Sequence, residues 1–237
     1  MPINDLYGKA LLDFQNGNFT EDIKTYSTIG GEDIYPLHYL FRSFGEMPVL
    51  EQKALQLARG KIVDVGCGSG SHSLYLQQNN KDVLAIDISK GAIETCKLRG
   101  IKNAKIQDIW KLKNQKFDTI LLLMNGAGMC GTLSKLPDFL EHLSNLLTEN
   151  GQILLDSTDV KYLYENEDGN YEFDFNKPYY GETTFIMEYK GTKGQAFDWL
   201  YVDFNTLKQT AESVHLNCTL LATDDNDGFL AKITLNK

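Results

Sequence analysis

Five short apolar runs, separated by segments of helical character, constrain the fold of this 237-residue chain most strongly. The runs are continuous rather than alternating, as strands of a parallel sheet covered on both faces require. They are KIVDV (61–65), DVLAID (82–87), AKIQD (104–108), FDTILLLM (117–124) and QILLDS (152–157). Five βα units in this order predict an α/β fold with a doubly wound sheet.

Local signals predict the helices and the end of the sheet. Ser89 suits the N-cap of a helix that ends before Gly100, and Pro137 lies in the first turn of another. Near the C-terminus, CTLLATD and FLAKITL flank an Asp-Asn-Asp-Gly turn at 225–228, which indicates an antiparallel hairpin. We therefore expect a mostly parallel, seven-stranded sheet that ends in this hairpin.

Two segments lie outside the core pattern. The first 60 residues contain helix candidates around 5–16 and 37–58, separated by a Gly-Gly break at 30–31, and predict a helical lid. Residues 159–204 begin with a polar, Tyr-rich stretch and continue with ETTFIMEYK and AFDWLYVDF, which predict an inserted β-hairpin.

Charge and cysteine content exclude several classes of partner. Lys and Arg number 23 against 32 Asp and Glu, a net charge of −9 that argues against nucleic acid as substrate. The four cysteines lie far apart without metal-ligand spacing, so we expect reduced thiols, no metal site and a cytoplasmic location. The N-terminus has no apolar signal run and no segment approaches the roughly 18 apolar residues of a membrane span, so we expect neither secretion nor a membrane span.

A glycine-rich loop follows the first strand. Gly66, Gly68 and Gly70 lead directly into a helix, so the backbone can approach a ligand and the helix offers free N–H groups. Asp64, just before the loop, would repel a pyrophosphate and attract an ammonium group, or it caps the loop's own amides. Asp87 ends the second strand, where a ribose-binding acid belongs.

Four motifs in order resemble the class I S-adenosylmethionine-dependent methyltransferases: VDVGCGSG (63–70), VLAIDIS (83–89), IQDIW (106–110) and FDTILLLMNGAG (117–128). The resemblance covers roughly residues 50–160 and implies a Rossmann-like fold that uses S-adenosylmethionine as its cofactor. It implies that the glycines line the methionyl part, that Asp87 binds the ribose hydroxyls, and that Asp108 and the Ile109 N–H bind adenine. The cofactor positions expected are Tyr39, Arg42, Asp64, Gly66, Cys67, Gly68, Gly70, Asp87, Ile88, Asp108, Ile109 and Met124.

Some of these positions have a plainer interpretation. The glycines also suit tight strand–helix packing, Asp87 lies beside the N-cap Ser89, and Asp108 also suits a surface turn. Tyr39 and Arg42 are one helical turn apart and can reach the cofactor's carboxylate, because Arg binds carboxylates bidentately, but a solvated, salt-bridging Arg is an equal alternative.

The sequence names no catalytic base. His38 and Asn125 are the candidates, although His38 also suits a surface position. Asn125-Gly126-Ala127-Gly128 departs from the Asp/Asn-Pro-Pro-aromatic motif of family members that methylate nucleic-acid amino groups. A base is needed only if the acceptor arrives protonated.

An aromatic group in the insertion predicts an acceptor pocket over the carboxyl ends of the strands. The alternatives are packing of the hairpin or a subunit contact. The residues are Tyr171, Phe173, Phe175, Tyr179, Tyr180, Trp199 and Tyr201.

We therefore expect four parts: an N-terminal helical lid (1–60), a cofactor-binding core (61–158), an acceptor-side cover (159–204), and a closing helix and hairpin (205–237). The predicted function is methyl transfer to a small molecule. The alternative is a catalytically silent protein of this fold that binds the cofactor or a partner. The sequence does not set the acceptor or the oligomeric state.

Overall fold

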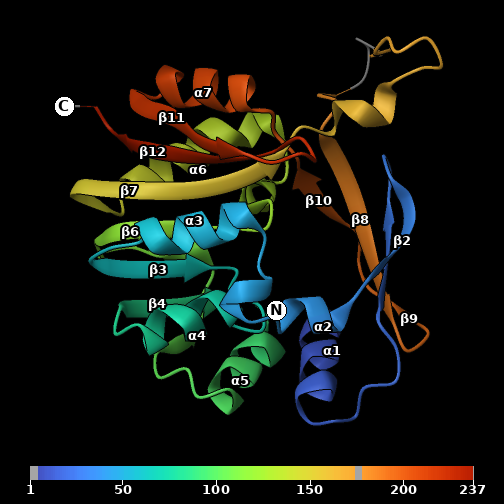
Figure 1. Ribbon diagram of the computed structural model, residues 1–237, viewed down its shortest axis with the longest axis vertical. Coiled ribbons are helices and arrows are strands. Elements are labelled where there is room, and N and C mark those ends of the chain that lie inside the picture. Colours follow the sequence, from blue (N-terminus) through green and yellow to red (C-terminus); the bar gives the residue numbers. More distant parts are fainter. Residues whose placement is uncertain (1–4, 174–177, 237) are drawn as a thin grey trace.

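A seven-stranded sheet forms the centre of the protein, whose computed structural model describes residues 5–173 and 178–236 (Figure 1). The strand order is β11-β12-β7-β6-β3-β4-β5. The five strands from β7 to β5 are parallel, and β12 and β11 continue the sheet antiparallel. The bounds are β3 (Lys61–Val65), β4 (Asp82–Asp87), β5 (Ala104–Ile106), β6 (Phe117–Leu122), β7 (Leu147–Thr158), β11 (Leu216–Thr223) and β12 (Gly228–Leu235). The α/β doubly wound prediction is confirmed.

Helices cover both faces of this sheet, which is why its inner strands read as continuous apolar runs. On one face lie α3 (Val49–Leu57), α4 (Ser71–Gln78) and α5 (Lys90–Leu98), and on the other lie α6 (Leu136–Ser144) and α7 (Phe204–Ser213). Short 3-10 turns complete the connections: η2 (Ile109–Lys111), η3 (Gly126–Cys130), η4 (Leu133–Lys135) and η5 (Val160–Tyr164).

The local helix signals act as predicted. The Ser89 hydroxyl accepts a hydrogen bond from the Ala92 N–H at 2.9 Å and caps α5. Pro137 lies in the first turn of α6. Within the described ranges no helix has both the length and the apolar character needed to cross a membrane.

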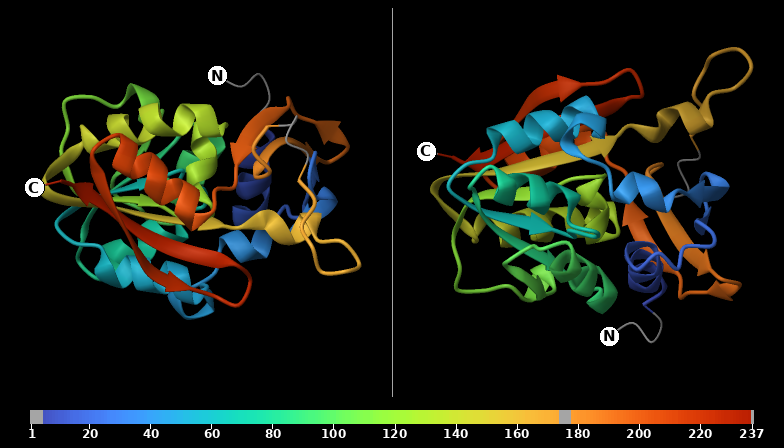
Figure 2. Two further views of the ribbon diagram at one scale, coloured as in Figure 1. Left: turned by 90° about the horizontal axis from the view of Figure 1, so that it is seen from above. Right: turned by 60° about the horizontal axis from the view of Figure 1, so that its bottom comes forward.

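A second sheet stands beside the edge at which β3 and β4 end (Figures 1 and 2). Its strand order is β10-β8-β1-β2, with β9 also paired to β8. The bounds are β1 (Ile23–Ser27), β2 (Gly31–Tyr35), β8 (Glu182–Tyr189), β9 (Thr192–Lys193) and β10 (Phe197–Leu200). The predicted hairpin of the insertion is present, because β10 pairs antiparallel with β8.

The N-terminal segment is only partly helical, which corrects the expectation of a helical lid. The predicted helices are present as α1 (Leu6–Gln15) and as α2 (Leu37–Leu40), η1 (Phe44–Glu46) and α3. Between them, residues 23–35 form β1 and β2 around the Gly30-Gly31 break. These strands were not predicted because β1 is stabilised by pairing with β8, more than 150 residues away.

Helix α1 joins the second sheet to the core. It packs against both α5 and β8. The Asp5 carboxylate accepts hydrogen bonds from the Ser89 hydroxyl and the Gly91 N–H, each at 2.9 Å. Gly8 and Gly91 allow the two helices to approach closely, because a Cβ on Gly91 would overlap the Gly8 backbone. Residues near the N-terminus are thereby placed beside the glycine loop.

Candidate active site

The glycine loop between β3 and α4 is held in a conformation that favours glycine. The φ angles of Gly66, Gly68 and Gly70 are +69°, +54° and +84°. The N–H groups of Gly66 and Cys67 both donate to the Ile86 carbonyl, at 2.9 and 3.0 Å, so the loop is tied to the end of β4. This arrangement leaves the loop backbone without side chains at three of five positions.

Asp87, at the end of β4, binds the same loop. Its carboxylate accepts from the Gly68 N–H at 3.0 Å and from the Ser89 N–H at 2.8 Å. Burial raises the pKa of Asp87 to about 6, against the opposing effect of these two backbone bonds. The carboxylate is therefore ionised at neutral pH and available as an acceptor for hydroxyl groups.

Tyr7 of α1 lies over the loop and was missed in the sequence. A Cβ added to Gly68 would lie 2.6 Å from the Tyr7 hydroxyl oxygen. Burial raises the pKa of Tyr7 well above its ordinary value, and the charge of Asp87 adds to the effect. Tyr7 is therefore a neutral hydroxyl beside Gly68, and no local pattern around residue 7 predicts this position over the loop.

The other core acids make local contacts. Asp64 is buried and accepts from the Ser73 hydroxyl at 2.6 Å, which ties β3 to α4. Asp108 caps η2 by accepting from the Trp110 N–H at 3.0 Å, and its side chain is 32% exposed beside Lys111. These contacts agree with the plainer interpretation of both acids, and their roles toward a cofactor stay predictions.

The remaining expected cofactor positions differ in exposure. Ile88 is 60% exposed beyond the end of β4, whereas Ile109 is buried in the core of the larger sheet. Cys67 is buried with its sulfur 3.7 Å from the sulfur of Cys96. None of these observations tests a contact with the cofactor.

The end of β6 adopts an unusual backbone. Met124 and Asn125 have φ angles of +64° and +60°, which non-glycine residues rarely adopt. The Asp156 carboxylate of β7 accepts from both of their N–H groups, at 3.1 and 2.7 Å, and holds this turn. Asp156 was missed in the sequence. Burial raises its pKa to about 6.

The two catalytic candidates make no contact that supports catalysis. The Asn125 side-chain oxygen accepts from the Thr158 hydroxyl at 2.9 Å. His38 is exposed on the short helix α2. A role for either residue in catalysis stays a prediction.

The segment after α2 is fastened to the glycine loop. The Leu40 carbonyl accepts from the Ser69 hydroxyl and, at 2.7 Å, from the Ser71 hydroxyl. The Arg99 guanidinium donates to both serine hydroxyls, at 2.9 and 3.1 Å. These bonds hold residues 40–42 against the loop, and a role of this segment as a cover over the cofactor stays a prediction.

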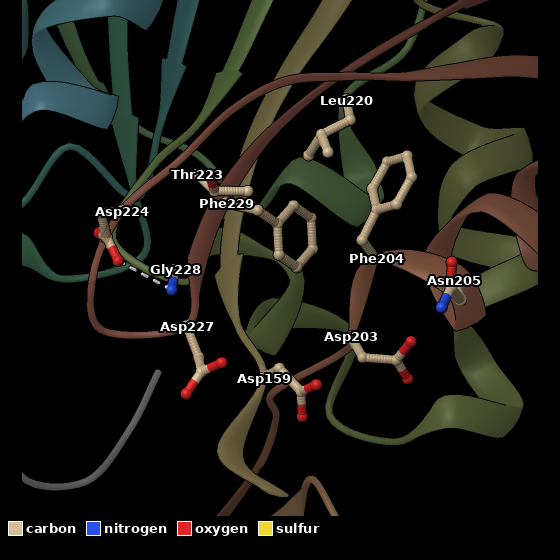
Figure 3. A pocket seen from close by; sticks show the side chains of 10 residues that line it. All are labelled: Asp159, Asp203, Phe204, Asn205, Leu220, Thr223, Asp224, Asp227, Gly228 and Phe229. Carbon is tan, nitrogen blue, oxygen red and sulfur yellow. Dashed lines mark hydrogen bonds between the residues drawn. The ribbon is translucent and has the colours of Figure 1, made fainter. Parts of the chain in front are cut away.

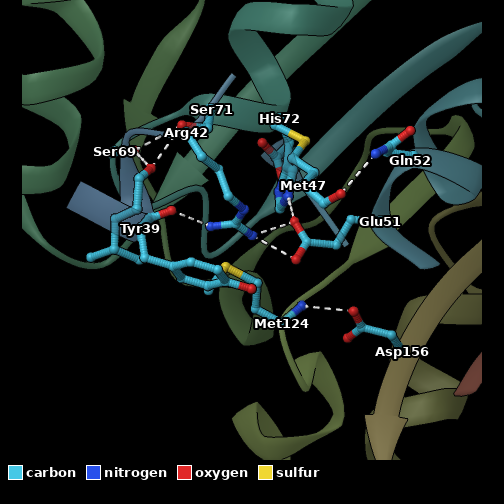
Figure 4. Close-up of polar contacts among 12 residues, drawn as sticks. Tyr39, Arg42, Met47, Glu51, Gln52, Ser69, Ser71, His72, Met124 and Asp156 are labelled. Atoms are coloured by element: carbon cyan, nitrogen blue, oxygen red, sulfur yellow. Dashed lines mark hydrogen bonds and ion pairs between the residues drawn. The ribbon is translucent and has the colours of Figure 1, made fainter. Parts of the chain in front are cut away.

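Arg42 belongs to a buried charge cluster with Glu51 of α3 and His72 of α4 (Figure 4). Its Nη2 donates to both carboxylate oxygens of Glu51, and His72 Nε2 lies 2.5 Å from Glu51 Oε2. Arg42 Nη1 donates to the Tyr39 carbonyl at 2.5 Å, and the guanidinium lies 4.0 Å from the Tyr39 ring centroid. Arg42 is therefore neither solvated nor on the surface.

Contacts within the cluster shift the pKa of Glu51 down and that of His72 up, which favours the charged form of each. Burial by itself raises the pKa of Glu51, but the hydrogen bond from His72 and the charges of His72 and Arg42 outweigh it and lower that pKa. Burial lowers the pKa of His72, but its hydrogen bond to Glu51 and the charge of Asp64 raise it overall. Glu51 and His72 were missed because a helix residue gives no sequence signal for a partner on another helix.

Of the aromatic group expected in the insertion, Trp199 and Tyr201 lie apart from the others and pack with two further rings, Phe185 and Phe197. We name these four the acceptor wall: Phe185 lies on β8, Phe197 and Trp199 on β10, and Tyr201 directly after β10, with ring centroids 5.9 to 6.4 Å apart. Trp199 packs on Gly128 of η3, where a Cβ would overlap the indole. The second group packs Phe173, Tyr179 and Tyr180 together, with the Tyr180 hydroxyl donating to Asp159 at 2.8 Å. Phe175 lies outside the described residues.

Two cavities lie away from the glycine loop. One of about 250 Å³ is lined by residues of the β11–β12 hairpin and the start of α7, with Asp159, Asp203, Asp224 and Asp227 around it (Figure 3). The other, of about 560 Å³, lies between the start of β8 and residues 131–132 and includes Glu182 and Asp198. Neither is lined by residues 66–70. In residues 5–173 and 178–236 no group of three or more acidic, His or Cys side chains is arranged to hold a metal ion.

Comparisons with known proteins agree on one family. A methyltransferase domain family model matches residues 57–183. The crystal structure of an S-adenosylmethionine-dependent methyltransferase from Bacteroides fragilis, in complex with S-adenosyl-L-homocysteine, is 39% identical, with a TM-score of 0.93 and coverage of 100% of this chain and 98% of that one. No curated protein matches this chain.

More distant structures share the fold. The CcbJ methyltransferase from Streptomyces caelestis is 12% identical, with a TM-score of 0.65 over 99% of this chain and 100% of its own. A methyltransferase from Clostridium acetobutylicum is 17% identical, with a TM-score of 0.56 over 78% of this chain and 87% of its own. The family match and the Bacteroides similarity do not favour a catalytically silent protein.

Proposed function

This chain belongs to the S-adenosylmethionine-dependent methyltransferases, and we propose that its methyl acceptor is a small molecule with a flat or partly apolar body. The observation that carries the proposal is the acceptor wall on β8 and β10. Trp199 anchors this wall to η3 at Gly128, three residues after Asn125 in the turn that follows β6. Aromatic rings suit a small apolar ligand better than a polyanion.

The residues of the loop region fit the cofactor. Gly68 has no side chain where a Cβ would meet Tyr7, and the ionised Asp87 carboxylate accepts hydrogen bonds beside it. Asp87 would hold the ribose hydroxyls, the glycine loop would lie along the methionyl part, and Arg42 would face the carboxylate. When bound, S-adenosylmethionine supplies a methyl group activated by a sulfonium centre.

The chain's own residues contribute position and exclusion of water. Methyl transfer is an in-line displacement, for which orientation supplies much of the rate. The Asp156 carboxylate fixes the Met124–Asn125 turn at the strand end, and the acceptor wall stands on the adjoining η3. Burial raises the pKa of Tyr35 and of Tyr201, so both phenols stay neutral donors rather than acting as bases at neutral pH.

The net charge of −9 supports a small molecule over nucleic acid. The test is a panel of aromatic and aliphatic amines, phenols and carboxylic acids, with RNA and DNA alongside, incubated with S-adenosylmethionine. S-adenosylhomocysteine formation and the methylated product are followed by mass spectrometry. We expect turnover with one class of small molecule only. Turnover confined to nucleic acid, or the absence of turnover with any small molecule in the panel, would contradict the proposal.

A further inference from the structure

The buried charge cluster of Arg42, Glu51 and His72 has no evident purpose in stability. Its three residues are at most 8% exposed; Arg42 lies just after α2, Glu51 on α3 and His72 on α4. A buried ion pair loses hydration that its attraction only partly restores, and apolar residues of equal volume often serve stability as well or better. Such a cluster is better explained by what it orients than by what it stabilises.

One of the three guanidinium nitrogens of Arg42 has no hydrogen-bond partner among the described residues. The Arg42 Nη2 binds Glu51 and Nη1 binds the Tyr39 carbonyl, while Nε, which is also buried, has no hydrogen-bond partner among residues 5–173 and 178–236. A buried charged donor without a partner is costly, and a carboxylate is the ligand that Arg binds best. The unused Nε–H therefore points to an anionic group that arrives with a ligand.

The cluster adjoins the glycine loop. The Leu40 carbonyl, two residues before Arg42, accepts from Ser71, and His72 is the next residue after Ser71. Groups of both charge signs lie at the cluster: the Arg42 guanidinium, the Glu51 carboxylate that it binds, and the Asp64 carboxylate, whose charge acts on His72. A ligand with a carboxylate beside an ammonium and a sulfonium matches this mixture of charges.

We propose that Glu51 and His72 are positioning residues that orient the Arg42 guanidinium toward the carboxylate of the cofactor's methionine end, an inference that rests on the proposed function. Both carboxylate oxygens of Glu51 accept hydrogen bonds from Arg42 Nη2, and these bonds fix the orientation of the guanidinium. His72 Nε2 binds Glu51 Oε2 and holds that carboxylate in place against the Arg42 guanidinium. Neither residue touches the reacting atoms.

The test uses two ligands that differ at this end. S-adenosylhomocysteine carries the amino-acid carboxylate, and 5′-methylthioadenosine lacks the whole amino-acid group while keeping the adenosine. Both are titrated calorimetrically into the full chain and into Glu51→Gln and His72→Gln. Gln52→Ala is the matched control, because Gln52 lies on the same helix and binds only the Met47 carbonyl.

We expect Glu51→Gln and His72→Gln to weaken S-adenosylhomocysteine about tenfold while methylthioadenosine changes less than about twofold. If the variants lost affinity for both ligands equally, Glu51 and His72 would have only a structural role. If they lost affinity for neither ligand, the two residues would not position Arg42, and the inference would be wrong. If Glu51→Gln fails to fold, Glu51→Asp and His72→Gln replace it in the same comparison of S-adenosylhomocysteine with methylthioadenosine affinity. A wild-type chain that binds neither ligand would contradict the proposed function itself rather than this inference.

Discussion

The two sides of the proposed cofactor site are built in different ways. The core side consists of backbone and one short acid: the loop 66–70 and Asp87 come from neighbouring βα connections and bind each other directly. The opposite side consists of side chains from distant segments, such as Tyr7 and Arg42, that depend on buried partners. The core side therefore fixes position through backbone geometry, whereas the opposite side fixes it through charge pairs and packing.

This difference predicts different responses to substitution. A change on the core side alters the shape available to every ligand that contains adenosine. A change on the opposite side acts on the methionine end or the acceptor and spares adenosine. Ligands truncated at one end therefore separate the two sides.

Gly68→Ala is expected to have the largest effect. The substitution places a Cβ at φ +54°, which costs roughly 1–2 kcal/mol, and drives it against the Tyr7 hydroxyl. We expect S-adenosylhomocysteine affinity to fall at least about a hundredfold by calorimetry. The control is Gly100→Ala, which has φ +87° and open space around its Cβ. Equal loss in both variants would show that backbone strain alone is responsible.

Asp87→Ala is expected to weaken the cofactor by about 1.5–3 kcal/mol, the scale of a hydrogen bond to a charged group. Because the ribose is common to both ligands, S-adenosylhomocysteine and methylthioadenosine should weaken alike. Asp82→Ala, at the exposed start of the same strand, is the control and should change neither affinity. If Asp87→Ala weakened S-adenosylhomocysteine but not methylthioadenosine, Asp87 would contact the amino-acid end of the ligand rather than the ribose, which would contradict this account.

Acidification should weaken the core side before it unfolds the protein. The pKa of Asp87 is about 6, so the ionised acceptor is lost as the pH falls through 6, and affinity should drop by up to about tenfold per unit below it. Because this folded-state pKa is above the unfolded value, protonation of Asp87 favours the folded chain between about pH 4 and 6. Calorimetry from pH 5 to 8 measures the affinity for S-adenosylhomocysteine, and thermal melts over the same range measure the stability of the folded chain. Affinity that stays constant from pH 8 to pH 5 would contradict the role of Asp87.

Asp108→Ala should have the smallest effect, about two- to tenfold, because its carboxylate is partly exposed and already caps η2. If Asp108 accepts from the adenine amino group, wild type should prefer S-adenosylhomocysteine over S-inosylhomocysteine, and the variant should lose this preference. If Asp108→Ala still preferred S-adenosylhomocysteine over S-inosylhomocysteine, Asp108 would not bind adenine and would only cap η2.

The same contrast explains how much the sequence predicts. The bounds of β3 and β4 agree with the predicted runs, and the glycine loop follows as expected, because these features depend on local patterns and burial on both faces. Strand β2 is largely exposed and has no alternation, so only its pairing with β1 identifies it. His72 reads as an ordinary helix residue, because its partner Glu51 lies on another helix.

Hydrogen exchange with and without S-adenosylhomocysteine tests the proposed two-sided site most directly. Amides of residues 66–70 and of residues 37–47 should both gain protection when the ligand binds, because the proposal puts the ligand between the glycine loop and the segment that carries Arg42. Helix α7, on the far side of the sheet, should exchange unchanged. Protection of 66–70 with unchanged exchange in 37–47 would contradict the account, and the N-terminal segment would then be scaffold only.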